Sequence, residues 1–504
     1  MPNPSATYQA ELDAARNDLR AEKSDLEQLL APIHETEVSR QQVPGLLKQA
    51  YSRLGNLRAS LAGRARPVTK AAEIAALIER AKDALHTGEG FSLEDADRAF
   101  EAACERCLAL GDEPEATARM RAGQARIAAL KQDYRRAAEL FAQAAATPGL
   151  EVPWQWQYQK ERAAVLEDLG REFGDNAALE QAIELYETTI LVLAPRTERP
   201  DDWATVQNNL GNALGVLGQR QRGTWMLERS ITAFENALSE RSRERVPLDW
   251  AVTQNNLGNA LGILAQRQSD TEMLEKAIEA FESALEVRTQ EQTPQDWATT
   301  QNNLGAALMS LGQRKKDTKT LKKSVDAYKN VLQEWTRERV PLDWAMTLNN
   351  LGTALRVLGE HRKGPRTLEQ AVAAYRSALV ERTRKRVPLD WAMTQNNLGA
   401  ALQKLGERQD DARILVEAVA AYENALEEWT RERMPMVWAM TTANLGVARR
   451  ILAERAQDVE ISRMAVAAFE AAAEVFHDAS HAQYYELAEE QLAKARAVAA
   501  ELSG

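Results

Sequence analysis

A repeat with a period of 47 residues constrains this sequence more than any other feature. Six tryptophans stand at that spacing: Trp203, Trp250, Trp297, Trp344, Trp391 and Trp438. The text around them recurs as DWATVQNNLGNAL, DWAVTQNNLGNAL, DWATTQNNLGAAL, DWAMTLNNLGTAL, DWAMTQNNLGAAL and VWAMTTANLGVAR. Self-similarity at a fixed period of about 20–50 residues is the signature of stacked repeat architectures. The 504 residues are therefore predicted to form an array of similar units.

Each unit is predicted to consist of two α-helices. A second recurring block, such as LERSITAFENAL or LEKAIEAFESAL, follows each tryptophan block. Ala, Leu, Glu, Gln and Arg dominate both blocks, and these residues are strong helix formers. In the unit that contains Trp203, we expect helices over 203–217 and 225–241. Asp202 is placed to cap the first of them, and Gly218 to help end it.

The unit resembles the tetratricopeptide repeat, whose pattern is Leu-Gly in the first helix and Ala-x3-aromatic-x2-Ala in the second. In one unit Leu257–Gly258 supplies the first part, and Ala277, Phe281 and Ala284 supply the second. The resemblance covers residues 203–476 and implies an all-α fold, a right-handed superhelical α-solenoid of helix-turn-helix repeats.

The length of the unit departs from the usual 34 residues of the family. Repeats with longer units and an NNL motif, such as those of kinesin light chain, are similar in this respect. Insertions are tolerated best in connections. We therefore expect the extra residues to lie between the two helices of a unit and between units.

The segments that flank the regular units extend the array. Four regions are expected: a helical region with a short heptad at 1–66, divergent hairpins at 67–150, the solenoid of one divergent and six regular units at 151–476, and a C-terminal capping helix at 477–504. In the divergent unit, Tyr186 matches Phe234 at a spacing of 48, so one residue has slipped.

The heptad rests on three leucines at a spacing of seven, Leu12, Leu19 and Leu26. Such a segment can dock on its own chain as a helical hairpin, or pair with a second copy as a coiled coil. Both interpretations remain open.

Asparagines form a stripe along the first helices. On a helical wheel they lie opposite the side that carries the leucines and Gly211. The candidate binding residues are Asn208, Asn209, Asn212, Asn255, Asn256, Asn259, Asn302, Asn303, Asn349, Asn350, Asn396, Asn397 and Asn444. Because asparagine is a poor helix former, its recurrence along adjacent helices needs another reason.

Two interpretations of this stripe remain open. By the resemblance, first helices line a concave groove, and asparagines there grip the backbone of an extended peptide. One amide offers both donors and an acceptor, which suits this role. Residues that vary between units would then supply specificity: Asn212, Asn259, Ala306, Thr353 and Ala400. Alternatively, the amides bond to one another and keep the stack in register.

The tryptophans at the 47-residue spacing are predicted to pack between units. Two others, Trp335 and Trp429, end their second helices and are expected to be more exposed. Both begin basic segments, and similar basic segments lie at 241–245 and 382–386.

These basic segments could dock an acidic protein or RNA. Alternatively, their cations complement helix C-termini and pair with the interleaved Glu244, Glu338 and Glu432. The formal net charge of −11 favours the second interpretation.

The sequence lacks two motifs that are common in enzymes. It contains neither a GxxxxGK[ST] phosphate loop nor a GxSxG nucleophile elbow. Cys104 and Cys107 have no second pair to complete a zinc site. No catalytic residue, metal or cofactor is therefore expected. A chain without a long apolar run or a signal-like N-terminus is expected to be cytoplasmic and free of membrane.

The sequence thus predicts a non-catalytic scaffold or adaptor that binds a peptide or partner protein in the groove of a solenoid. One alternative is a structural protein that forms homo-oligomers through 1–66 or through the solenoid ends. A lesser alternative is RNA binding along the arginine-rich loops, which the acidic composition disfavours.

Overall fold

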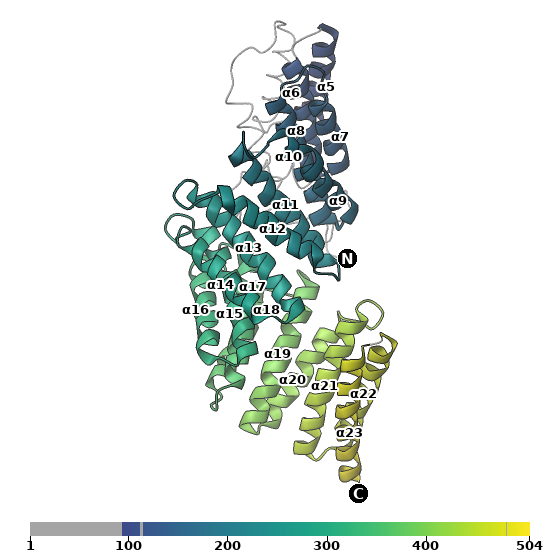
Figure 1. Ribbon diagram of the computed structural model, residues 1–504. Coiled ribbons are helices and arrows are strands. Elements are labelled where there is room, and N and C mark those ends of the chain that lie inside the picture. Colours follow the sequence, from purple (N-terminus) through teal and green to yellow (C-terminus); the bar gives the residue numbers. More distant parts are fainter. Residues whose placement is uncertain (1–92, 111–113, 480, 504) are drawn as a thin grey trace. The chain divides into compact units, whose positions relative to one another are not determined.

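The computed structural model describes residues 93–110, 114–479 and 481–503, and helices joined by short connections make up these residues (Figure 1). The predicted all-α class is confirmed, and the described residues contain no strand. Residues 1–92, which include the heptad predicted at 1–66, lie outside the described residues.

The helices before the regular units are α5 (Leu93–Leu110), α6 (Pro114–Leu130), α7 (Tyr134–Ala145), α8 (Val152–Phe173), α9 (Asn176–Leu185), the π-helix η1 (Tyr186–Ile190) and α10 (Leu191–Leu193). The six regular hairpins are α11 (Pro200–Arg220) with α12 (Trp225–Glu240), α13 (Pro247–Gln268) with α14 (Thr271–Leu285), α15 (Pro294–Lys315) with α16 (Thr318–Glu334), α17 (Pro341–Glu360) with α18 (Arg366–Glu381), α19 (Pro388–Gln409) with α20 (Ala412–Leu426), and α21 (Pro435–Ala456) with α22 (Val459–Asp478). The last helix is α23 (Ala482–Ser503).

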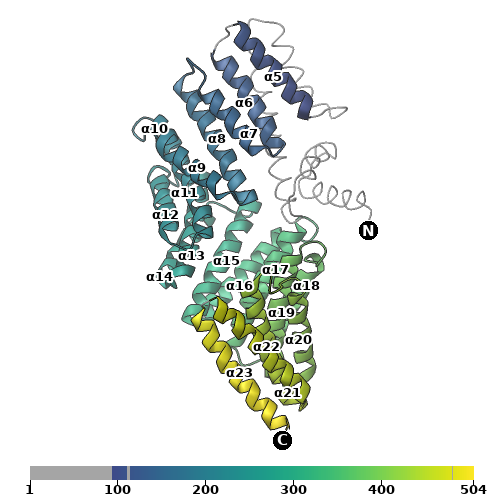
Figure 2. The same cartoon turned by 90° about the vertical axis from the view of Figure 1, so that its right-hand side faces the viewer.

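The helices belong to two compact units, which we call the first unit (through Val287) and the second unit (from Arg288). Within each, a first helix packs on its second helix, and that second helix packs on the next first helix. At the end of the second unit, α21, α22 and α23 lie side by side (Figure 2). First helices of neighbouring hairpins approach one another more closely than second helices do. Each unit is thus an α-solenoid with the first helices as its inner layer.

Proline begins every regular first helix. Pro247 stands at the first position of α13, where a residue without an N–H leaves no bond unmade. The expected start at Trp203 is therefore three residues late, and Gly218 lies inside α11 rather than beyond its end.

The extra residues of the long unit lengthen its helices. Between α13 and α14 the chain needs only Ser269, in a left-handed conformation at φ 56°, and Asp270. The Asp270 carboxylate caps α14 by accepting hydrogen bonds from the amides of Glu272 (2.8 Å) and Met273 (3.3 Å). The expectation of an insertion between these two helices is wrong, because α13 has 22 residues.

Two glycine positions of a first helix admit side chains of the second helix. A Cβ on Gly352 would lie 2.8 Å from the ring of Tyr375, and one on Gly359 would lie 2.8 Å from Leu368. Gly211 receives Phe234 in the same way, at 2.6 Å. The predicted packing face of the first helix is therefore confirmed.

A buried residue from each connection between hairpins fills the space beside successive first helices, and we call its place the spacer position. Arg241 donates from Nη1 to Thr253 Oγ1 (2.8 Å) in α13 and from Nη2 to Thr205 Oγ1 (3.1 Å) in α11. The same register holds Arg288, Trp335, Arg382 and Trp429, each at most 7% exposed.

The expectation that Trp335 and Trp429 are more exposed is therefore wrong. Trp335 packs against Val331 and Ala298, and its Nε1 donates to Gln295 Oε1 (3.2 Å). Either arginine or tryptophan can fill the spacer position, because both carry a flat group at the end of an apolar stem.

The one-residue slip of the divergent hairpin has a structural origin. Ile190 lies four positions after Tyr186, whereas the matching Ala237 lies three positions after Phe234. Ile190 and Ala237 are both fully buried. The extra residue is taken up by η1, where the hydrogen bonds span one residue more than in an α-helix.

Candidate functional site: an amide row on the first helices

Each regular first helix except α21 carries two consecutive asparagines near its middle. We call the first the leading asparagine: Asn208, Asn255, Asn302, Asn349 and Asn396. We call the second the trailing asparagine: Asn209, Asn256, Asn303, Asn350 and Asn397, with Asn444 alone in α21. The whole set is the amide row.

Hydrogen bonds link the amide row from one first helix to the next. The trailing amide donates from Nδ2 to the leading Oδ1 of the preceding hairpin. These bonds join Asn256 to Asn208 (3.3 Å) in the first unit, and Asn350 to Asn302 (3.4 Å) and Asn397 to Asn349 (3.1 Å) in the second.

A second set of bonds lies within the pairs. The leading Nδ2 donates to the trailing Oδ1, in Asn208–Asn209 (3.4 Å), Asn255–Asn256 (3.4 Å) and Asn349–Asn350 (3.5 Å). Most of these distances exceed the usual 2.9–3.0 Å. A carboxamide has two N–H groups and two lone pairs, so these bonds use half of the capacity of Asn256 and leave one donor and one acceptor.

The two asparagines differ in exposure in three of the five pairs, whereas the leading Asn302 and Asn396 are half-buried like their trailing neighbours. The leading Asn208, Asn255 and Asn349 are only 6%, 6% and 4% exposed. Every trailing member of α11 to α19 is half-buried, and Asn444 is exposed. Both members of a pair therefore take part in the bonds between successive first helices, and the trailing member also reaches solvent. Asn212 and Asn259, one turn further along, are also half-buried.

The row ends at α19. Asn396 Oδ1 is buried and accepts no hydrogen bond, because the next first helix has Ala443 and an exposed Asn444 in place of a regular pair. A buried acceptor without a donor is unusual. The worn last repeat thus interrupts the amide row.

The residue seven positions beyond the leading asparagine gives the two units different surroundings. In the second unit Gln403 accepts a hydrogen bond from the Tyr422 hydroxyl (3.2 Å), and Arg356 pairs with Glu360. Burial raises the pKa of Tyr422, so this hydroxyl stays protonated and donates. In the first unit the position holds Gly215 and Gly262. The sequence expectation missed Arg356 and Gln403, although their fixed spacing from the asparagines was available as a signal.

The loop arginines are engaged between hairpins. Arg196 donates to Glu240 (2.6 Å), Arg337 to Glu381 (2.6 Å) and Arg384 to Glu428 (2.5 Å). Each guanidinium thus reaches the end of the next second helix. The cations pair with acidic groups as one interpretation expects, but their partners are not the interleaved Glu244, Glu338 and Glu432. Arg384 also lies over the Trp391 ring, at 5.7 Å.

Three of the regular segments match a known family model. Residues 250–290, 297–334 and 391–428 match the tetratricopeptide repeat. Each matched segment spans a first helix and its second helix, as the hairpin geometry requires. Tetratricopeptide repeats are generally non-catalytic and act as scaffolds for protein interaction.

Several solved structures show a weak similarity to this chain. The C-terminal part of a TPR repeat-containing protein from Cytophaga hutchinsonii is 16% identical over 60% of this chain and 93% of that chain, with a TM-score of 0.38. The human IFIT1 dimer with m7Gppp-AAAA is 16% identical over 98% of this chain and 99% of that chain, with a TM-score of 0.44. The TPR2AB domain of yeast Sti1 in its pHSP90 complex is 16% identical over 64% and 98%, with a TM-score of 0.21.

No curated protein matches this sequence significantly. Among the described residues, no helix combines the length and the apolar character needed to cross a membrane. In the same part of the chain, no three His, Cys, Asp or Glu side chains gather as a metal site would require.

Proposed function

We propose that this protein is a non-catalytic cytoplasmic adaptor that binds an extended peptide segment of a partner protein along the amide row. One observation carries the proposal: the trailing Asn256 and Asn350 reach solvent with a donor and an acceptor that the row leaves unused. A peptide unit offers one N–H and one C=O, which such an amide can satisfy together.

The proposal assigns separate work to the two asparagines of a pair. The leading members, of which Asn208, Asn255 and Asn349 are buried, serve to hold successive first helices in register. The trailing members contact the peptide backbone, which requires no particular sequence. Selectivity then comes from residues beside the row that vary between hairpins, such as Asn259, Thr353 and Ala400.

The test uses the full chain and a displayed library of linear peptides. Peptides selected on the natural protein are measured against two triple variants in the second unit. The first replaces the trailing Asn303, Asn350 and Asn397 by Ala, and the matched control replaces the leading Asn302, Asn349 and Asn396 by Ala.

We expect the trailing variant to lose at least about tenfold in affinity, because each lost amide contact contributes about 1 kcal/mol. Its melting temperature should fall less than that of the leading variant, because the trailing side chains are half-buried whereas the leading Asn349 is buried. The leading variant should melt at a lower temperature. Full binding by the trailing variant would contradict the proposal, as would a library that yields no peptide.

The ion pairs of the loop arginines disfavour a nucleic-acid surface, because binding phosphates would require breaking them. Self-association through 1–66 depends on residues outside the described part of the chain. Light scattering on the full chain and on one lacking those residues would test it, and a monomer in both would exclude it.

A further inference from the structure

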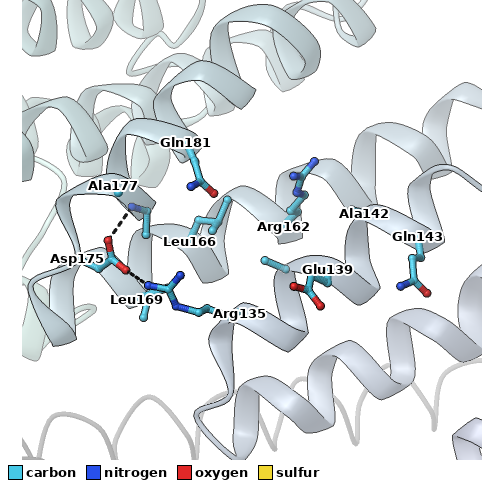
Figure 3. Close-up of a pocket in the computed structure, with 12 residues that line it drawn as sticks. Arg135, Glu139, Ala142, Gln143, Arg162, Leu166, Leu169, Asp175, Ala177 and Gln181 are labelled. Atoms are coloured by element: carbon cyan, nitrogen blue, oxygen red, sulfur yellow. Dashed lines mark hydrogen bonds and ion pairs between the residues drawn. The ribbon is translucent and has the colours of Figure 1, made fainter.

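A cavity of about 380 Å³ lies between α7, α8 and α9 in the first unit (Figure 3). Leu166 and Leu169 of α8 line it together with alanines of α7 and α9. Arg135, paired with Asp175 at 2.5 Å, stands on one side, and Arg162 of α8 stands on the other (Figure 3). This site lies where α7 and α9 pack against α8, and no asparagine of the amide row lines it.

The cavity is open because two of its walls are alanine. Ala138 follows Ala137 of the Ala-x3-aromatic pattern in α7. The six regular second helices carry a branched residue at the same position: Ile231, Ile278, Val325, Val372, Val419 and Val466.

The facing wall is truncated as well. Ala178 precedes Leu179 in α9. The regular hairpins have a larger residue before the position that matches Leu179, which is leucine in five of them and Ser462 in the last: Met226, Met273, Thr320, Thr367, Ile414 and Ile461. Side chains of that size would occupy the space, so the divergent hairpin is hollow where its neighbours are filled.

Arg162 occupies a position that is leucine in every regular repeat. The register follows from Gly170, which receives Leu179 just as Gly218 receives Leu227. At this spacing of 48, Arg162 corresponds to the leucine of the Leu-Gly motif: Leu210, Leu257, Leu304, Leu351, Leu398 and Leu445.

The Arg162 guanidinium is poorly satisfied within the protein. Its Nε is buried and donates to no partner, and Nη1 lies 3.5 Å from Gln159 Oε1. No carboxylate pairs with Arg162 among the described residues. A buried donor without an acceptor destabilises a fold, so leucine would be the better choice if packing were the sole task here.

We propose that this cavity binds a ligand that joins a carboxylate to an apolar body about the size of a leucine side chain. The guanidinium of Arg162 presents a planar pair of donors that matches a carboxylate. The alanine and leucine walls cover the apolar part, and the volume lies within the range of small-molecule pockets. Arg135 is already paired with Asp175, and Glu139 adds a carboxylate to the lining, so Arg162 is the guanidinium that supplies positive charge to the ligand.

A free organic acid and the C-terminal residue of a peptide share this chemistry. Isothermal titration calorimetry on the full chain separates them with four probes. These are 4-methylpentanoate, its carboxamide, the tripeptide acetyl-Ala-Ala-Leu with a free carboxylate, and the same tripeptide as a carboxamide. Saturable binding of both acids assigns a peptide C-terminus, and binding of 4-methylpentanoate alone assigns a free acid.

Two variants restore the regular repeat at the cavity: Arg162→Leu and Ala138→Ile. Both place a residue that other hairpins already accommodate, so folding should survive, as circular dichroism would verify. Each should weaken the binding of the acid at least about tenfold. Arg162→Leu should also raise the melting temperature, since a functional residue is often a local defect of packing. Arg222→Leu, at an exposed loop of the same unit, is the matched control and should bind as the natural protein does.

The proposal is overturned if neither acid binds at concentrations up to about 10 mM, where even weak pockets fill. It is also overturned if a carboxamide binds as well as its acid, or if Arg162→Leu and Ala138→Ile both retain the affinity of the control. None of these results would affect the amide row, because both variants leave the asparagines intact.

Discussion

Two hairpins share the same fold but differ in the side chains at the middle of the first helix, which are charged in one and neutral amides in the other. They are the divergent hairpin of α8, α9 and η1 and the regular hairpin of α17 and α18. In α17 the middle of the first helix carries the amides of Asn349 and Asn350. In α8 the same positions hold Lys160 and Glu161, and Glu161 accepts two hydrogen bonds from Arg126 of α6 (2.8 and 2.9 Å).

The difference continues along the helix. Arg356 in α17 corresponds to the buried Glu167 in α8, which accepts a hydrogen bond from the Tyr186 hydroxyl. The comparison teaches that packing fixes the apolar registers, while a few inner positions accept amides, ion pairs or a buried acid without loss of the hairpin. Those positions are where different repeats acquire different chemistry.

The largest expected effect lies at Glu167. Burial raises its pKa from the ordinary 4.5 to about 7, against the hydrogen bond from Tyr186 and the charge of Arg171. A group whose pKa is raised by folding stabilises most below pH 4.5, and this contribution is lost as the pH rises through 7. The difference corresponds to about 3 kcal/mol.

Glu167→Gln should therefore abolish a fall in the stability of the divergent hairpin between pH 5 and pH 8. Hydrogen exchange of α8 and η1, corrected for intrinsic rates, measures it, and α17 serves as the internal reference. Equal protection of α8 at both pH values in the natural protein would show that Glu167 titrates normally.

The next largest effect is expected at the glycine of the Leu-Gly motif, which the divergent hairpin lacks. Gly352→Ala should destabilise α17–α18 by about 2 kcal/mol, because the new Cβ would lie 2.8 Å from the buried Tyr375 ring. At the matching position α8 already holds Ala163, which is fully buried. Ala163→Gly should cost about 1 kcal/mol through lost helix propensity. Urea unfolding followed by local hydrogen exchange would test the pair, and a neutral Gly352→Ala would contradict the close approach.

The spacer position gives a smaller effect. Arg382→Ala should cost about 1.5 kcal/mol, because it leaves space between α17 and α19 and removes the bond to Thr394 Oγ1 (3.1 Å). Arg382→Trp should cost less, since Trp335 and Trp429 fill the same position. The divergent hairpin has Ala194 there, fully buried. A tryptophan variant less stable than the alanine variant would show that the spacer positions are not equivalent.

The smallest effect is expected where the two regions agree. Arg196, which follows the divergent hairpin, and Arg384, which follows α18, each pair with a glutamate of the next second helix and are 51% exposed. Replacing either by Ala should cost no more than about 0.5 kcal/mol, and salt should screen it. Melting curves at low and high salt would measure both. A much larger loss at one site would mean that its ion pair belongs to a wider network.

The sequence predicted what repeats six times and was less successful with what occurs once. Leu-Gly and the facing aromatic residue are fixed by contact between neighbouring helices, so Gly211 and Phe234 could be paired from their pattern. Helix ends were less certain, because Pro247 can either stop a helix or begin one. The burial of Trp335 could not be foreseen, since it depends on the distance between successive first helices.

The candidate sites differ in the same way. The amide row is visible in the sequence, but only the structure shows that the leading Asn208, Asn255 and Asn349 are buried while their trailing neighbours are half-buried. The cavity has a sequence signal, because Arg162 replaces a recurring leucine, yet the signal appears only after the slip of one residue is placed. The structure places that slip in η1.

The π-helix also has a consequence for everything that follows it. One residue added to an α-helix turns the rest of that helix by about 100°, and in a stack each hairpin takes its orientation from the previous one. Without compensation, a single inserted residue would therefore change the orientation of every later repeat. In η1 the inserted residue is absorbed within five residues, and Ile190 is again buried as Ala237 is. The array can therefore contain a repeat of different length and chemistry while the six repeats that follow keep their 47-residue register.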